Sequence, residues 1–261
     1  MRGLASASIL LLSACALALP AQARTLQQVL NDGTLRVGVA LAAPWTLRAD
    51  SGELAGFEID VARKLAADMR VRPEILVYSF ADLVRALETQ EIDLIAAGLA
   101  ITPERALHVN FSAPYASGGV SLATNTMRTA DVQRFEELNA DRYRVAAVEG
   151  SVAVALARRL LPNAQLREFA STEAASAALV EGDADAYLEE EPVPTFLALE
   201  HAGRIDVPIA NPLLPTHAAF AVNKGDVDFL AFLNAWITAR EADTWLATTY
   251  SYWFESLDWR D

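Results

Sequence analysis

The stretch from residue 98 to residue 105, with the sequence GLAITPER, combines features that could bind a small anion. It follows the apolar run Ile92–Ala97, which is short enough to be a buried strand. Thr102 is a favourable helix N-cap, and Pro103 suits the first helical position because its missing N–H would have no intrahelical partner there. Free N–H groups and the helix dipole attract negative charge, and Arg105 adds a planar cation that matches a carboxylate. The stretch therefore predicts a socket for a carboxylate or a similar anion.

Arg105 also has a simpler interpretation, in which it lies on the surface and pairs with Glu104 or Asp82. The two interpretations differ in where the guanidinium lies, in a cleft or in solvent. The spacing of the residues agrees with both, so the choice depends on whether the rest of the chain supplies the other half of a site.

Segments with strand and helix patterns alternate along the chain, which favours an α/β fold with a largely parallel sheet. In the first half we expect strands at 35–40, 75–77 and 92–97, and helices at 25–30, 61–69 and 82–90. In the second half we expect strands at 144–148, 166–169, 185–188, 205–207 and 217–222, and helices at 152–161, 172–181, 192–202 and 227–240, with a final aromatic helix.

Two α/β units imply two lobes that are joined by two chain crossings. Ser121–Thr126 is expected to join the units, and Ser117–Gly119, after a turn at Pro114-Tyr115, is expected to approach the hinge. The strand His217–Val222 is expected to return to the first lobe. The resulting boundaries are 24–121 and 217–261 for lobe 1 and 122–216 for lobe 2. A cleft between lobes is a favoured place for a small-molecule site, and two crossings allow hinge closure.

The N-terminus has the pattern of a signal peptide over residues 1–23. Arg2 precedes an apolar run from Leu4 to Leu19, and Ala21-Gln22-Ala23 is a small-x-small cleavage site. A competing interpretation is a bacterial lipobox at Leu12–Cys15, which would leave a lipid-modified Cys15 as the first residue. The chain is therefore expected in the periplasm, as a soluble protein or as a lipoprotein.

Composition excludes several classes of function. Cys15 is the only cysteine, so a chain cleaved after Ala23 has no disulfide and no thiol chemistry. The formal net charge of −13 disfavours nucleic acid and anionic membranes as partners. The three histidines lie far apart, and neither a nucleophile elbow nor a phosphate-binding glycine loop is present. We expect no metal, no cofactor and no catalytic residue.

Three blocks carry a family resemblance: Gly56–Ala62, Ile92–Ala106 and Phe111–Tyr115. They resemble the family-3 solute-binding proteins, the periplasmic amino-acid receptors of ABC importers. The likeness spans essentially the whole mature chain. It implies a two-lobed Venus-flytrap fold that closes around one amino acid or a close analogue. It also implies an ABC permease in the inner membrane as partner, and we expect the receptor to be a monomer.

The resemblance assigns the two ends of the ligand. Arg105 would clamp the α-carboxylate, helped by backbone N–H groups at Gly98, at Ala100 and in the turn Gly150-Ser151-Val152. The family usually has Ser or Thr where this chain has Ala100 and Val152, so both N–H groups are kept and two hydroxyls are lost. Glu190 would bind the ligand ammonium, where the family usually has the shorter Asp.

Glu190 is flanked by Glu189 and Glu191, so a slip of one residue is an open alternative. Alternation along a strand would place both flanking residues on the face opposite Glu190. Three adjacent glutamates are also typical of a solvated surface run.

Aromatic residues would line the side-chain part of the pocket. Phe80 matches the family's aromatic platform, with a core phenylalanine as the alternative, and Trp45 could cap the pocket or be structural. Ala42 stands where the family usually has Tyr, and no Asp lies near Val39. These departures disfavour a basic ligand and point to an apolar or atypical one.

Two other functions use the same fold. A few family members are exported cyclohexadienyl or arogenate dehydratases, and Glu190 or a neighbour could act as a general acid if burial raised its pKa. No basic or hydroxyl partner is evident beside it. A sensory or accessory module is a further alternative, and the lack of a second domain after Asp261 counts against it. We therefore expect a binding protein and not an enzyme.

Overall fold

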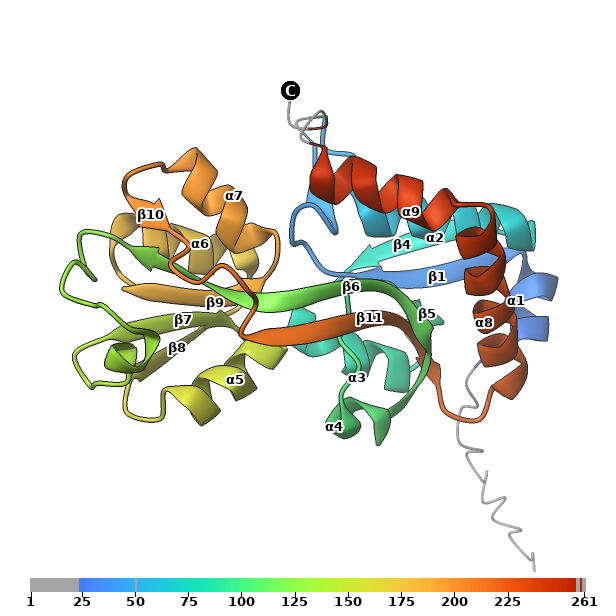
Figure 1. Ribbon diagram of the computed structural model, residues 1–261. Helices are drawn as coiled ribbons and strands as arrows, with labels where there is room; N and C mark the ends of the chain where they lie inside the picture. Colours follow the sequence, from blue (N-terminus) through green and yellow to red (C-terminus); the bar gives the residue numbers. More distant parts are fainter. Residues whose placement is uncertain (1–23, 50, 257–258, 260–261) are drawn as a thin grey trace, which may run out of the picture.

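The computed structural model describes residues 24–49, 51–256 and 259, which form two α/β lobes side by side (Figure 1). The predicted signal peptide, which includes Cys15, lies outside the described residues. The strands of the main sheet lie in the order β4 (Arg72–Val77), β1 (Thr34–Val39), β5 (Leu94–Ile95), β11 (Leu214–Asn223), β6 (Val109–Asn125), β9 (Ala186–Glu190), β7 (Arg144–Val148) and β8 (Gln165–Phe169), with β10 (Ile205–Asp206) paired to β6. Among the helices in these residues, none is long and apolar enough to cross a membrane.

The first lobe has a parallel sheet with helices on both faces. Strand β1 pairs in parallel with β4 on one side and with β5 on the other. Its strands are β1 (Thr34–Val39), β4 (Arg72–Val77) and β5 (Leu94–Ile95), beside a small hairpin of β2 (Leu47–Arg48) and β3 (Leu54–Ala55). Its helices are α1 (Leu26–Asp32), α2 (Phe57–Met69), α3 (Leu83–Glu88), α4 (Pro103–Ala106), α8 (Val227–Ala242) and α9 (Trp245–Tyr250).

The second lobe repeats this arrangement on a smaller scale. Strand β7 pairs in parallel with β8 and with β9. Its strands are β7 (Arg144–Val148), β8 (Gln165–Phe169), β9 (Ala186–Glu190) and β10 (Ile205–Asp206). Its helices are α5 (Val152–Leu160), α6 (Thr172–Glu181) and α7 (Val193–Glu200).

Two long antiparallel strands join the lobes. Strand β6 (Val109–Asn125) and strand β11 (Leu214–Asn223) pair from Val120 opposite Leu214 to Val109 opposite Asn223. Figure 1 shows this green and orange ribbon running from one lobe into the other. The expected turn at Pro114-Tyr115 is wrong, because both residues lie within β6, where a register shift near Ala218 absorbs the irregularity.

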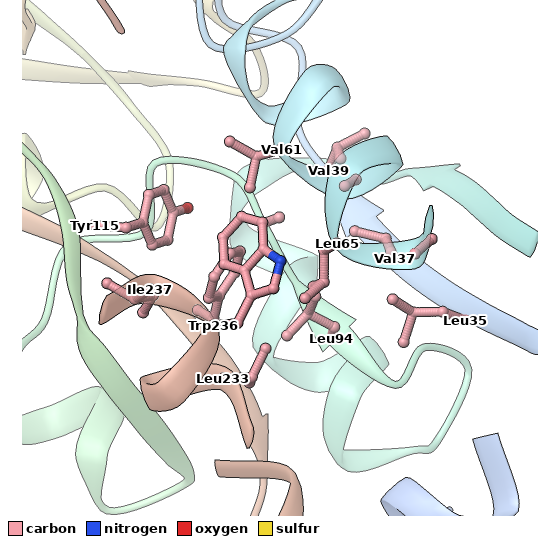
Figure 2. Close-up of a cluster of buried hydrophobic side chains, with 14 of the residues drawn as sticks. Leu35, Val37, Val39, Val61, Leu65, Leu94, Tyr115, Leu233, Trp236 and Ile237 are labelled. Carbon is pink, nitrogen blue, oxygen red and sulfur yellow. The ribbon is translucent and has the colours of Figure 1, made fainter. Parts of the chain in front are cut away.

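The core of the first lobe explains the apolar positions of its helices. Trp236 of α8 lies among Val61 and Leu65 of α2 and Leu94 of β5 in one buried cluster (Figure 2). A second cluster on the other face of the sheet is built around Leu83 and other residues of α3. The sheet of the second lobe is likewise packed on both faces, so each lobe has its own core.

Local capping signals place most helix starts where the sequence predicts them. The side chain of Thr102 accepts the N–H of Arg105, and Pro103 is the first residue of α4, as expected. Helix α6 differs, because Ser171 and not Thr172 is its N-cap, accepting the N–H of Ala174. The strand predicted at 92–97 shortens to Leu94–Ile95, since the chain turns soon afterwards through Gly98 at φ 61°.

Candidate functional site

Residues of both lobes line one cavity of about 350 Å³. The residues expected to bind the ligand all border it: Trp45, Phe80, Gly98, Ala100, Arg105, Ser151, Val152 and Glu190. They come from loops and strand ends that are far apart in the sequence, so the fold brings them together.

The guanidinium of Arg105 points at backbone oxygens of both lobes. It donates from Nη1 to the carbonyl of Ala100 at 2.7 Å and from Nη2 to the carbonyl of Gly150 at 2.9 Å. In the described part of the chain no carboxylate pairs with it, and Asp82 pairs instead with Arg85 at 3.0 Å. The surface interpretation of Arg105 is therefore wrong. Burial is the main cause that lowers its pKa to about 10, so the group remains a cation at neutral pH.

Two backbone N–H groups near this cation are free to donate a hydrogen bond to a ligand. Ala100 lies opposite Ala218 in an antiparallel bridge, and the hydrogen bonds of this bridge are made by the residues on either side of the pair. The N–H of Ala100 therefore has no acceptor within residues 24–49, 51–256 and 259. Val152 is the first residue of α5, where an N–H has no intrahelical acceptor. The buried hydroxyl of Ser151 beside it also lacks a partner among the described residues. Together with Arg105 these groups can hold a carboxylate.

Gly98 does not offer its N–H as expected. That N–H donates to Oε1 of Glu58 at 2.6 Å, and the hydroxyl of Tyr115 donates to the same oxygen at 2.7 Å. Glu58 is fully buried, and a buried carboxyl requires such donors. Burial is the largest influence on Glu58 and raises its pKa to about 7. Gly98 thus borders the cavity while its donor is already used.

Glu190 lies at the end of β9, two residues beyond the strand that the sequence predicts. Its Oε2 accepts the hydroxyl of Thr216 at 2.9 Å. Burial, the main cause, raises its pKa to about 7, while the bond from Thr216 and the charge of Arg105 act in the opposite direction. The carboxyl makes no ion pair within the described residues, so it can bind a cation.

The carboxyl groups of Glu189 and Glu191 accept hydrogen bonds from other partners, so the three adjacent glutamates are not equivalent. Glu189 is 6% exposed, accepts the hydroxyl of Tyr187 at 2.6 Å and also accepts the N–H of Glu190. Burial raises the pKa of Glu189. Glu191 accepts the hydroxyl of Thr195. A solvated surface run is therefore the wrong description of this segment.

Two aromatic side chains form walls of the cavity. Phe80 packs against the core clusters of both lobes, and the guanidinium of Arg105 lies 5.4 Å from the centre of its ring. Trp45 is 5% exposed and lies so close over Gly98 that an added Cβ there would be 2.9 Å from the indole. Each residue is thus both a packing residue and a cavity wall.

The sequence interpretation missed a further strip of the lining, formed by Val77–Ser79 of the first lobe and Ala170–Glu173 of the second. These segments lie at and just beyond the carboxyl ends of β4 and β8, the two edge strands of the sheet. Ligands of α/β proteins bind beyond the carboxyl ends of parallel strands. That rule was the available signal, because both strands were predicted.

Comparisons with known proteins cover the same two-lobed unit. A family model described as bacterial extracellular solute-binding proteins, family 3, matches residues 35–256. A probable amino-acid ABC transporter periplasmic-binding protein of Sinorhizobium fredii is 28% identical over 91% of this chain and 83% of its own length. The cyclohexadienyl dehydratase of Pseudomonas aeruginosa is 24% identical over 91% of this chain and 88% of the dehydratase. A putative binding component of an ABC transporter from Wolinella succinogenes, solved in complex with lysine, has a TM-score of 0.81 at 28% identity and covers 87% of this chain and 98% of that chain.

Proposed function

The chain belongs to the bacterial extracellular solute-binding proteins, family 3, and we propose from this that it captures an amino acid or a close analogue for import by an ABC transporter. We place it in the periplasm, as a monomer that delivers its ligand to a permease in the inner membrane. In this proposal the first lobe comprises residues 24–121 and 217–261, and the second lobe comprises residues 122–216. The observation that carries the proposal is that Arg105 and Glu190 border one cavity while Arg105 bonds backbone carbonyls and Glu190 bonds Thr216, so the two charges do not pair with each other.

In this proposal each end of a zwitterion meets its opposite charge. The ligand carboxylate binds Arg105 and the N–H groups of Ala100 and Val152, a set of donors that suits an anion. The ligand ammonium binds Glu190, and its positive charge favours the ionised form of that carboxyl. Because Arg105 and Ala100 belong to one lobe and Val152 and Glu190 to the other, tight binding requires both lobes.

A catalytic role is the weaker candidate for this site. The raised pKa of Glu190 would suit a general acid, and a dehydratase is among the relatives. The probable amino-acid binding protein and the lysine-bound structure are relatives of the binding class. A carboxyl opposite a carboxylate socket is explained by binding an amino acid alone, so we propose that the chain is not an enzyme.

The experiment is isothermal calorimetry on the purified mature chain with a panel of L-amino acids. Arg105→Ala is expected to weaken binding by about 2–5 kcal/mol, because it leaves a buried carboxylate without its cation. Arg63→Ala is the matched control, since Arg63 is an exposed residue of α2 that donates to the carbonyl of Leu54 and does not line the cavity. Near-normal affinity of Arg105→Ala would refute the assigned role, and turnover of prephenate or arogenate by the purified protein would favour the dehydratase.

A further inference from the structure

From the contacts that line the cavity we infer that the preferred ligand has a bulky apolar side chain, aliphatic or aromatic. This inference rests on the proposed function, because it takes the two ends of an amino acid as already placed. It concerns the remaining wall of the cavity, which we call the side-chain compartment. Its lining is Leu41, Val77, Tyr78, Ser79, Phe80 and Ala170–Glu173.

The side-chain compartment is separate from the two polar ends of the cavity. Arg105, Ser151 and Val152 meet around the carbonyl of Gly150, which fixes the carboxylate end. A Cβ added at Gly118 would lie 3.1 Å from Oε2 of Glu190 and 4.0 Å from Cζ2 of Trp45, so these two groups share the ammonium end. A ligand held at both ends must direct its side chain toward the part of the wall that neither end occupies.

Two hydroxyl groups of the side-chain compartment already donate a hydrogen bond within their own lobe. Tyr78 donates to Glu91 at 3.1 Å, and Ser79 donates to Asp82 at 2.7 Å. Ser171 accepts the N–H of Ala174 as the cap of α6. A polar ligand side chain that accepts from Tyr78 or Ser79 would have to break one of these bonds, which lowers affinity.

The charges near the compartment also disfavour polar ligands. Both oxygens of Glu189 are used, by Tyr187 and by the N–H of Glu190. The side chain of Glu173 makes no ion pair in the part of the chain that the structure describes, but it is exposed at the rim. An exposed ion pair changes affinity by no more than about fivefold. Burying a large apolar side chain raises affinity roughly tenfold to a hundredfold, so the apolar contribution outweighs that of an exposed ion pair.

The test is a binding panel on the wild-type chain: leucine, isoleucine, methionine, phenylalanine and tryptophan against arginine, lysine, glutamine, glutamate and glycine. We expect the tightest ligand to be one of the first five and to bind at least tenfold more tightly than any of the others. A charged or amide ligand as the tightest would overturn the inference and leave the proposed function standing. Binding of no amino acid at all would overturn both.

A variant pair tests the compartment directly. Val77→Thr keeps the shape of the residue and replaces a methyl group with a hydroxyl in the compartment, so affinity for the best apolar ligand should fall about threefold to tenfold. Val227→Thr is the matched control, an exposed valine at the start of α8 and far from the cavity lining. Unchanged affinity in Val77→Thr, or an equal loss in Val227→Thr, would contradict the assignment of the compartment.

Discussion

Glu58, which is buried, and Glu190, which lines the cavity, are carboxyl groups with different partners. Glu58 uses one oxygen to hold the N–H of Gly98 and the hydroxyl of Tyr115, while its other oxygen has no partner among the described residues. Glu190 accepts a single hydroxyl, from Thr216. Glu58 therefore supports the turn that leads to Arg105, and Glu190 keeps the capacity to bind a ligand cation.

The buried carboxyl of Glu58 should make stability depend on pH. Its pKa rises from 4.5 to about 7 in the folded protein, so folding favours the protonated form. The stabilisation is complete below pH 4.5 and is lost as the pH rises through 7. Between pH 5 and pH 8 the wild type should lose up to about 3 kcal/mol of unfolding free energy relative to Glu58→Gln, which cannot ionise. Urea unfolding of both proteins at the two pH values measures the difference.

Glu53→Gln is the control for this experiment, because Glu53 is exposed. It should change the unfolding free energy equally at both pH values. A constant difference between the wild type and Glu58→Gln across the range would show that Glu58 titrates at its ordinary pKa.

At the scale of elements, the turn between β7 and α5 is built so that the second lobe can touch the first. Gly150 has φ +77°, and a Cβ added there would lie 2.7 Å from Cα of Ala81, which belongs to the other lobe. The backbone of Ala81 cannot yield as the end of a flexible side chain could. The absence of a side chain at Gly150 therefore permits the contact between the lobes.

Gly150→Ala should weaken ligand binding by at least tenfold, because the added methyl group collides with Ala81 only when the lobes are in contact. The matched control is Gly203→Ala, which has nearly the same φ, +82°, and nothing within 4 Å of an added Cβ. Both variants carry the cost of a left-handed residue, about 1–2 kcal/mol of stability. Calorimetry and thermal melting separate the two effects. Equal affinities in the two variants would mean that the contact at Ala81 does not limit closure.

Elements whose limits depend on neighbours in the sequence were predictable, and those that depend on distant partners were not. Thr102 and Pro103 set the start of α4 by local hydrogen bonding, and the sequence shows both. The path of β6 through Pro114 depends on its pairing with β11 about 100 residues later. The N–H of Gly98 is used by Glu58, which lies 40 residues earlier. Residue types therefore predicted the walls of the cavity, whereas the groups left free in it required the fold.

At the scale of the whole molecule, side chains outside the β6–β11 ribbon also join the lobes, among them Arg105, which donates to the carbonyl of Gly150. Phe80 packs on the cores of both lobes. Near the C-terminus, Trp259 lies 5.4 Å from Trp253 of the first lobe and 5.9 Å from Phe196 on α7 of the second, between ring centres. Trp253 is anchored by a hydrogen bond from Nε1 to Asp60 at 2.8 Å. Trp259 thus links an anchored residue of one lobe to a helix of the other.

Trp259→Ala should therefore allow the lobes to separate more often. Small-angle X-ray scattering of the variant without added ligand should give a larger radius of gyration than the wild type. Ligand affinity should fall about threefold or more, because apparent affinity scales with the fraction of molecules whose lobes are in contact. Tyr252→Ala is the matched control, an exposed aromatic residue of the same segment whose ring packs on Trp253 within one lobe. If scattering and affinity match the wild type in both variants, Trp259 is not needed to hold the lobes together. If both variants change equally, the C-terminal segment acts through the stability of the first lobe and not as a link between lobes.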